Sequence, residues 1–375
     1  MKLTINSVLQ VVIEKYSQKG EGVAFYQQIP IYVFGTIVQE VVVIQIACLK
    51  KTYAIGQVLE ILKPSANRVE HQVVNAHLIG GYELIHMNDQ EQIRFKKERF
   101  INDFWQIAKT KITDLAIFWG PTRFKYRNKI TLHDGHFYQK QTHKPIVIND
   151  YLLSDIKYDS KLPGTIIYRQ LENLIFGPKG TQKWTTDTML NHHFRIGLNS
   201  FYQVNSEVAQ VVYQDIIQFV IPQGITLDLY SGIGIIAILV AQKSSQVYGV
   251  EINRSAFADA QYNSKLNQLT NVEFFCQDVK KFLQNWNGKH KIDTLILDPS
   301  RLGIEKVVID LILQKIKPQR IIYLACNPGK QAANFKDLQV AYDLKFAKIY
   351  DMFPQTYHIE SLIVLERKEQ KKMVS

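Results

Sequence analysis

A cysteine and a glutamate in the last third of the chain have the types and positions that covalent catalysis requires. Cys326 is one of three cysteines in 375 residues, and it follows an apolar run and precedes Asn327-Pro328. This Asn-Pro pair should end a strand and present the thiol at the strand's carboxyl end, where open α/β sheets bind ligands. Glu360 lies among apolar residues, and burial would raise its pKa toward the range of a catalytic base. The alternative for Glu360 is a solvated charge at a strand edge.

A second group of residues indicates a nucleotide-containing cofactor. Gly232 and Gly234 in "DLYSGIGIIA" follow an apolar run and open a helical one, which lets a nucleotide approach the backbone. Glu251 ends the next strand pattern, where a carboxylate can accept both ribose hydroxyls, and Asp278 follows in the place for an adenine amino group. These residues alone would also suit NAD. Asp228, just before the glycines, can pair with a cationic methionyl group, which favours S-adenosylmethionine.

A further carboxylate stands at the same predicted sheet edge. Asp298 ends the strand pattern "LILDP" and is followed by Pro299. It is expected to point to the ligand site; the alternative is a helix N-cap with proline at the first helical position.

A thiolate, a carboxylate base and a sulfonium methyl donor together suit methylation at C5 of uracil, which is a poor nucleophile. Addition of the thiolate to C6 makes an enolate whose C5 attacks the methyl group. The base then removes the C5 proton so that the thiolate can leave. Covalent catalysis of this kind divides one hard step into easier ones.

The elements that must position these residues alternate between strand and helix patterns from about residue 199. Alternation of this kind predicts a parallel sheet with crossover helices. The last two strand patterns, "LKFAKIYDMFP" and "HIESLIVLERK", are too close in the chain for a parallel crossover and must be antiparallel. The five parallel candidates contain the stretches "ITLDL", "QVYGVEI", "VEFFCQD", "DTLILDP" and "RIIYLACNP". We therefore predict an α/β fold with a Rossmann-like S-adenosylmethionine methyltransferase sheet over residues 199–375.

The preceding residues predict two further parts. Residues 1–66 contain short strands rich in Val, Ile and Tyr with frequent turn signals, typical of a small OB-like antiparallel barrel. "KPSANR" (63–68) has the composition of a linker. Residues 67–198 predict a small central β-rich subdomain, with a helix in "DQEQIRFKKERFINDFWQIAKTK" and a hairpin over 122–150 that turns at "DGH".

Basic and aromatic residues alternate in the first arm of that hairpin, a pattern that suits RNA because cations meet phosphates and rings stack on bases. The net charge of +11 also indicates a polyanionic partner. A solvated strand face and compositional drift are the alternatives. The residues predicted to contact RNA are Arg123, Lys125, Tyr126, Arg127 and Lys129.

With these motifs the sequence resembles the RNA (uracil-5-)-methyltransferase family, especially the enzymes acting on 23S rRNA. The stretches "FYQVN", "DLYSGIG", "LDPSRLG", "YLACNP" and "MFPQTYHIESLIVLER" occur in family order, and the resemblance covers nearly the whole chain. It implies that Cys326 is the nucleophile and Glu360 the base. It also implies that S-adenosylmethionine is contacted by Gln203, Tyr230, Glu251 and Asp298.

The resemblance also implies that the first domain is a TRAM domain, which favours 23S rRNA as the substrate and leaves transfer RNA as the alternative. Many relatives bind an iron–sulfur cluster in the segment that corresponds to residues 67–87. Here Val73, Ile79 and Tyr82 occupy the cysteine positions, so we expect no cluster. The nearby histidines are irregularly spaced, and we expect no metal site. Ser300 replaces the second proline of the family's "DPPR" motif.

Two rival enzyme classes fit less well. Cytosine-5 RNA methyltransferases normally have Pro-Cys where this chain has Asp298-Pro299-Ser300, and amino-directed adenine enzymes need an aromatic residue after that turn. A catalytically impaired RNA-binding relative is the non-enzymatic alternative.

Composition bounds the remaining possibilities. The sequence contains no apolar run of the roughly 20 residues that a membrane span needs and no signal-peptide pattern. Its unpaired cysteine spacing argues against a disulfide framework. We expect a cytoplasmic protein without a membrane partner, acting as a monomer.

Overall fold

The structure is a computed structural model of the 375-residue chain. It describes residues 3–71, 73–140, 142–146, 148, 151–288 and 290–369. The chain divides into two compact units. Unit 1 comprises residues 1–99, 137–148 and 353–358, and unit 2 comprises residues 100–136, 149–352 and 359–375.

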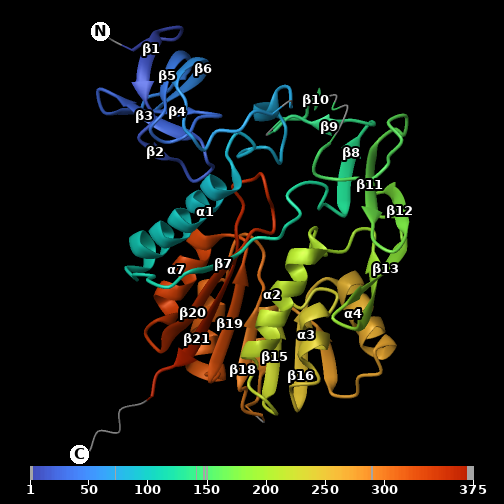
Figure 1. The fold of residues 1–375 in the computed structure, drawn as a ribbon. Helices are drawn as coiled ribbons and strands as arrows, with labels where there is room; N and C mark the ends of the chain where they lie inside the picture. The colour runs from blue at the N-terminus through green and yellow to red at the C-terminus, as the bar shows by residue number, and fades with distance from the viewer. Residues whose placement is uncertain are drawn as a thin grey trace, which may run out of the picture. The chain divides into compact units, whose positions relative to one another are not determined.

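Unit 1 begins with a six-stranded sheet in the order β1-β5-β6-β4-β3-β2, coloured blue in Figure 1. Its neighbouring strands are antiparallel except for β4 and β6, which are parallel. Inward-facing aliphatic side chains form its core, including Ile13, Ile31 and Ile44 with no exposed surface. This confirms a β-rich N-terminal part, while its closure as a barrel stays a prediction. The strands are β1 (Val8–Val12), β2 (Lys15–Tyr16), β3 (Gly22–Tyr26), β4 (Ile29–Val33), β5 (Val41–Leu49) and β6 (Ala54–Lys63).

The rest of unit 1 is mostly short segments and one long helix. The segment 353–358 belongs here because Gln355 exchanges hydrogen bonds with Gln92, and its carbonyl accepts from the Leu84 N–H at 2.9 Å. The boundary between the units falls after Arg99, inside the helix that the sequence predicted. These elements are the 3-10 helix η1 (Ala76–Leu78), α1 (Asp89–Asp103), β9 (Phe137–Tyr138) and β10 (Pro145–Ile146).

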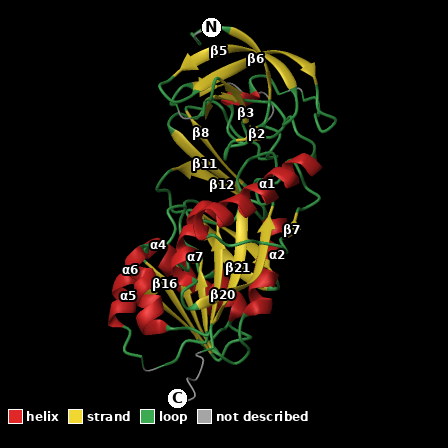
Figure 2. Ribbon diagram, turned by 90° about the vertical axis from the view of Figure 1, so that its left-hand side faces the viewer, coloured by secondary structure: helices red, strands yellow, loops and turns green. Residues whose placement is uncertain are grey.

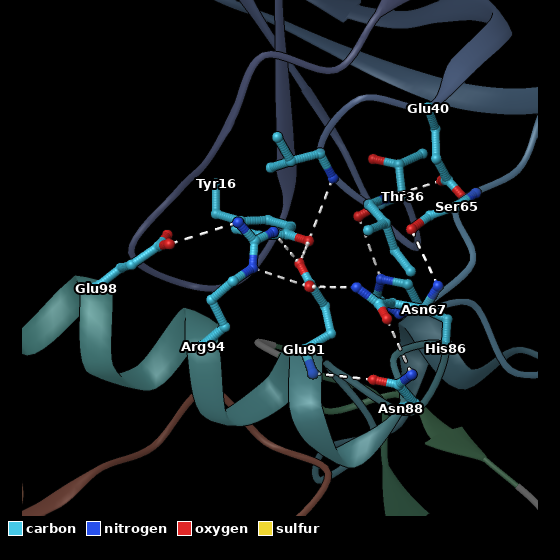
Figure 3. A network of polar contacts seen from close by, with 12 residues as sticks. Tyr16, Thr36, Glu40, Ser65, Asn67, His86, Asn88, Glu91, Arg94 and Glu98 are labelled. Carbon is cyan, nitrogen blue, oxygen red and sulfur yellow. Dashed lines mark hydrogen bonds and ion pairs between the residues drawn. The ribbon is translucent and has the colours of Figure 1, made fainter. Parts of the chain in front are cut away.

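A polar network connects the six-stranded sheet to the segment after it and to α1 (Figure 3). Arg68 binds the fully buried carboxylate of Glu40 through two nitrogens, at 2.6 and 2.7 Å. Glu91 of α1 accepts hydrogen bonds from Tyr16 and Asn67. The stretch 63–68 is therefore anchored to the six-stranded sheet through Arg68, and its role as a linker stays a prediction.

Two of the positions that correspond to cluster cysteines in relatives are packed in the interior of unit 1. Ile79 is 4% exposed and Tyr82 is fully buried. Leu84 and Met87 next to them join a small core with Phe95 of α1. These side chains fill space with apolar contacts, so the segment has its own packing.

Unit 2 contains an eight-stranded sheet in the order β17-β16-β15-β18-β19-β21-β20-β7. The five predicted parallel strands are confirmed, and so is the antiparallel final pair. The sequence did not predict β7, which adds to β20 in parallel at the edge. The strands are β7 (Ala116–Phe118), β15 (Ile225–Leu229), β16 (Gln246–Glu251), β17 (Val272–Cys276), β18 (Thr294–Leu297), β19 (Arg320–Ala325), β20 (Tyr342–Tyr350) and β21 (Glu360–Arg367).

Helices cover both faces of this sheet, as expected for strands that are apolar throughout. Figure 2 shows α2 and α7 on opposite sides of the strands. One face packs against α5, α6, α7 and the π-helical turn after α1, in the largest apolar core. No helix in the described residues is both long and apolar enough to cross a membrane. The helices are α2 (Ser206–Phe219), α3 (Ile235–Val240), α4 (Arg254–Leu266), α5 (Val279–Asn285), α6 (Lys306–Leu311) and α7 (Pro328–Leu338), with π-helical turns η2 (Phe104–Ala108) and η3 (Ile312–Ile316).

Two small antiparallel sheets precede α2 in unit 2. The predicted tight turn is present, because Asp134 and Gly135 both have positive φ and His133 and His136 exchange backbone hydrogen bonds. The predicted hairpin over 122–150 is wrong beyond that turn, because the strand before it pairs with residues 165–169. The strands are β8 (Lys129–His133), β11 (Thr165–Gln170) and β12 (Leu174–Pro178) in one sheet, and β13 (Trp184–Met189) and β14 (His192–Gly197) in the other.

Candidate active site

Cys326 lies immediately after β19, at its carboxyl end, as the sequence predicted. The strand stops there because Asn327 caps α7, with its side chain accepting from the Lys330 N–H at 3.3 Å. Pro328 then occupies the first turn of the helix, where its missing N–H leaves no partner unsatisfied. The thiol is thus held at the junction of a central strand and a helix.

Glu360 is the first residue of β21, the antiparallel neighbour of β19. Ala325 pairs with Ser361 in this ladder, and continuing the register by one residue places Glu360 opposite Cys326. Glu360 is only 3% exposed. A solvated charge at a strand edge, the alternative left open by the sequence, is therefore excluded.

Two buried polar side chains hold the two strands together beside this pair. Gln331 of α7 donates to the carbonyls of Tyr323 and Ser361 at 2.9 and 3.2 Å. The Ser361 hydroxyl lies 3.0 Å from the Ala325 carbonyl and 2.8 Å from the Gln331 side-chain oxygen. Sequence reasoning missed both residues, because glutamine on a helix and serine in a strand carry no distinctive signal.

Burial is the largest influence on the pKa values of both groups. Burial, followed by the charge of Glu360, raises the pKa of Cys326 to about 11. Burial and the nearby Asp298 raise the pKa of Glu360 well above its usual range. The guanidinium of Arg301 acts against both shifts and hydrogen-bonds the Cys326 side chain. A carboxyl of raised pKa is a strong base once it is ionised.

The loop between β15 and α3 has the backbone shape that close approach of a cofactor requires. Tyr230, Gly232 and Gly234 all have positive φ, of 69°, 56° and 85°. A Cβ at Gly234 would lie 2.7 Å from the ring of Phe274, so only glycine fits there. A tyrosine in this left-handed region is strained by about 1 kcal/mol or more, a feature that clusters at ligand sites.

Glu251 and Asp278 occupy the strand ends predicted for them. Glu251 ends β16, and its carboxylate accepts from the N–H groups of Gly232 at 2.9 Å and Asn253 at 2.6 Å. It is thereby fixed against the glycine loop. Asp278 follows β17 and caps α5, accepting from the Lys281 N–H at 3.0 Å, so this carboxylate has a structural role in addition to any ligand contact.

Asp228 of β15 is a fully buried carboxylate. It has no exposed surface, and the backbone N–H of Ala237 is the one group among the described residues that favours its charged form. Burial, followed by the charge of Asp298, raises its pKa well above the usual range. A buried carboxylate without a cation is costly, and the cationic ammonium group of a methionyl moiety would satisfy it. The site therefore fits S-adenosylmethionine.

Asp298 and Gln203 complete the predicted cofactor set. Asp298 follows β18 and is partly buried, and burial raises its pKa to about 7. No helix begins at Pro299; α6 starts later, at Lys306, so the N-cap alternative is excluded. Gln203 is 4% exposed, and its backbone carbonyl accepts from the side chain of Asn128 at 2.9 Å.

The residues predicted to contact RNA differ in their burial and in their contacts within the protein. Arg123 is ion-paired with the buried Asp351, and Tyr126 is 7% exposed. Lys129 lies opposite Arg169 in the β8–β11 ladder. Burial, followed by the charge of Arg169, lowers the pKa of Lys129 to about 8.

Lys125 and Arg127 lie nearer the surface. Lys125 forms an exposed ion pair with Asp155 at 2.9 Å, and Arg127 is partly buried, with its backbone N–H bonded to the Leu153 carbonyl. The structure thus gives Arg123 and Tyr126 internal contacts, and the RNA contacts of all five residues stay a prediction.

Comparison with known proteins finds similar sequences over most of the chain. A family model described as tRNA (Uracil-5-)-methyltransferase matches residues 185–368. An "uncharacterized RNA methyltransferase" of Mycoplasma mobile is 48% identical over 96% of this chain and 99% of its own length. A protein of the same description from Halalkalibacterium halodurans is 29% identical over 97% of this chain and 98% of its own.

A solved structure shares the fold. The tRNA (uracil-54, C5)-methyltransferase of Pyrococcus abyssi, in complex with S-adenosyl-L-homocysteine, superposes with a TM-score of 0.76 at 21% identity. The similarity covers 95% of this chain and 100% of that one. Together with the identity to the Mycoplasma mobile protein over nearly the whole of both chains, these matches show that the chain belongs to the S-adenosylmethionine-dependent RNA (uracil-5-)-methyltransferase family.

Proposed function

We propose that this chain transfers a methyl group from S-adenosylmethionine to C5 of a uridine in RNA. The observation that carries the proposal is the pairing of Cys326 and Glu360 across β19 and β21, in the same sheet as the fully buried carboxylate of Asp228 in β15. The proposed nucleophile and base thus share a sheet with a buried carboxylate that a cationic cofactor would neutralise.

When bound, the cofactor supplies an electrophilic methyl group on a positively charged sulfur. The Cys326 thiolate attacks C6 of the uracil, and the electrons of the C5–C6 bond move to the C4 oxygen as an enolate. C5 then takes the methyl group. Glu360 removes the C5 proton, the C5–C6 double bond reforms, and Cys326 leaves as thiolate. A uracil inside a helix cannot reach the thiol, so the base must be flipped out or single-stranded.

The other predicted residues hold the cofactor. Asp228 would pair with the methionyl cation, Glu251 would accept hydrogen bonds from the ribose hydroxyls, and Asp278 would accept from the adenine amino group. Gly232 and Gly234 allow the backbone to approach. Gln203, Tyr230 and Asp298 complete the contact set, as the family resemblance implies.

Two variants test the chemistry. Cys326→Ala should abolish 5-methyluridine formation but bind S-adenosylhomocysteine normally, because the thiol takes no part in holding the cofactor. Glu360→Gln should accumulate methylated RNA attached to the protein, visible as a slow band on denaturing gels. The matched control is Cys276→Ala, which removes an exposed cysteine at the end of the edge strand β17 and should leave turnover unchanged. Normal turnover by the Cys326 variant, or an inactive Glu360 variant without an adduct, would overturn the assignment.

We propose 23S rRNA as the substrate, on the strength of the motif resemblance and the N-terminal β-rich sheet as a TRAM, OB-like RNA-binding domain. Transfer RNA is the second candidate, because the family model is described by that substrate and the Pyrococcus abyssi enzyme shares the fold over the N-terminal sheet as well. Mapping 5-methyluridine in ribosomal and transfer RNA from a strain lacking this protein decides between them: the lost modification identifies the substrate.

We also propose a functional division into an RNA-binding domain (1–66), a central subdomain (67–198) and a methyltransferase domain (199–375), acting as a monomer without an iron–sulfur cluster. The interior positions of Ile79 and Tyr82 support the last point, since neither side chain offers the thiolate that holds an iron–sulfur cluster. Purified protein should be colourless and contain no stoichiometric iron by elemental analysis; a brown, iron-containing preparation would contradict this.

A further inference from the structure

The side chain of Asn263 in α4 contacts two separate parts of unit 2 at once. It has no exposed surface. Its oxygen accepts from the Arg195 N–H of β14 at 2.8 Å, and its nitrogen lies 3.2 Å from the Arg195 carbonyl. The same nitrogen lies 3.1 Å from the carbonyl of Ile233 in the glycine loop. All the hydrogen-bonding groups of this amide are therefore engaged.

Asn267, one helical turn later, makes half of the same pattern. Its oxygen accepts from the His193 N–H at 2.9 Å and its nitrogen donates to the His193 carbonyl at 2.7 Å. His193 and Arg195, two residues apart in β14, thus bond to Asn267 and Asn263, which lie four residues apart along α4 and its C-cap. The two amide side chains take the place that the backbone of a further strand would occupy. Asn267 has no contact with the glycine loop; its second N–H bonds to the carbonyl of Asn263 in its own helix.

Both partners of Asn263 lead to the proposed cofactor site. Ile233 lies between the two positive-φ glycines, and the Gly232 N–H on the other side of it is bound by Glu251. The loop is therefore held from two directions. β14 continues into the segment that carries Gln203. Arg169 holds this segment by donating to the Ser200 carbonyl at 2.6 Å.

A second set of contacts docks β14 on the same helix. Asp259 forms an ion pair with Arg195 at 2.7 Å and accepts from the Ser200 hydroxyl at 3.2 Å. The guanidinium of Arg195 lies 3.8 Å from the ring centre of Tyr262. Because these contacts hold β14 without Asn263, the loss of Asn263 should move the glycine loop more than it moves the strand.

We propose that Asn263 is a positioning residue for the cofactor: it fixes the glycine loop 231–234 against β14 and thereby sets the affinity for S-adenosylmethionine. The inference rests on the proposed cofactor site. It does not depend on Cys326, Glu360 or the identity of the RNA, because Asn263 acts before any chemistry.

Calorimetric titration with S-adenosylhomocysteine tests this with a matched pair. Asn263→Ala and Asn267→Ala each remove two hydrogen bonds to β14, and only the first removes the bond to Ile233. We expect Asn263→Ala to raise the Kd about tenfold, within the range of typical coupling effects, and Asn267→Ala to leave it within about twofold. Both variants should lower the melting temperature. Equal Kd values for the two variants would sink the inference, whereas a wild-type protein that does not bind S-adenosylhomocysteine would sink the proposed cofactor site itself.

A measurement on the unaltered protein covers the case in which Asn263→Ala does not fold. If Asn263 couples β14 to the cofactor site, the coupling acts in both directions. S-adenosylhomocysteine should therefore slow hydrogen exchange at the Arg195 N–H of β14, which donates to the Asn263 side chain. In Asn267→Ala this protection should persist. Exchange at residues 192–197 that is unchanged by ligand would contradict the proposal.

Discussion

Burial places the thiol of Cys326 in an unusual state for a nucleophile. Burial and the neighbouring Glu360 raise its pKa to about 11, and the guanidinium of Arg301 only partly opposes them. At neutral pH the group is a thiol, which is a far weaker nucleophile than the thiolate. In the proposed mechanism, attack on C6 therefore requires that the bound substrate lowers the pKa of this thiol.

The alkylation rate of Cys326 by iodoacetamide should therefore keep rising with pH up to about 11. A raised thiol pKa means that the reactive thiolate is scarce below that value. Rates followed by mass spectrometry in a Cys48→Ser, Cys276→Ser background isolate this cysteine. A rate that levels off below pH 9, near the ordinary pKa of a cysteine, would contradict the expected protonation state.

At the scale of elements, a buried ion pair between Arg68 and Glu40 anchors the segment that follows β6. Glu40 has no exposed side-chain surface and Arg68 only 19%. Burial acts to raise the pKa of Glu40, but hydrogen bonds from Arg68 and from the N–H groups of Ser65 and Ile37 outweigh it and lower the pKa. The stretch after β6 is thus attached to the six-stranded sheet by charge.

Arg68→Ala should destabilise unit 1 by about 3 kcal/mol, because removing one member of a buried pair leaves an unpaired buried charge. Urea unfolding with a probe in unit 1 measures this. Glu98→Ala, which breaks the exposed pair with Arg94 inside unit 1, is the control and should change stability by at most about 1 kcal/mol.

The same pair gives unit 1 a defined acid limit. Since the folded pKa of Glu40 is lowered, its contribution is present above the unfolded value of about 4.3 and is lost as the pH falls through the folded pKa. Arg68→Ala should lose this part of the acid sensitivity. A variant as stable as the unaltered protein at neutral pH would show that the pair contributes nothing.

The strands that carry the site could be predicted because each is a continuous apolar run that ends in a functional residue. Cys326 and Asp298 follow directly from that pattern, and their strands lie where the alternation of elements required. β7 could not be predicted, because its three residues are too few to show a period. The arm beginning at Lys129 was given the wrong partner, because the local turn at Asp134-Gly135 is visible in the sequence and the distant pairing with β11 is not.

The sequence also contains no indication of the amide side chains that connect the segments of the site. Gln331 and Asn263 lie on helices, where polar residues usually face water, and both are fully buried. Only the three-dimensional structure shows that each bonds to backbone groups of two other segments. Residues of this kind fix geometry without taking part in chemistry, so no motif marks them.

At the scale of the whole molecule, the net charge of +11 should dominate the affinity for RNA. Phosphate contacts release counterions, so the logarithm of the binding constant should fall linearly with the logarithm of salt concentration. Lys125→Ala, at the exposed member of the predicted RNA-contacting set, should reduce that slope by roughly 0.7 to 0.9, measured by filter binding. Lys306→Ala, an exposed lysine of α6 paired with Asp310, is the control; an equal reduction by both variants would mean that the predicted RNA-contacting residues have no special role.

The position of β7 has a consequence for how this protein is made. The strand is synthesised early, at Ala116–Phe118, and it pairs with β20, which ends at Tyr350. β20 in turn pairs with β21, which ends at Arg367. On the ribosome the first strand of the eight-stranded sheet must therefore wait for almost the entire chain to be translated. Non-local pairing of this kind is slow and leaves edges exposed to other chains, so synthesis of β20 and β21, and not of any earlier segment, is the event that allows β7 to join the sheet.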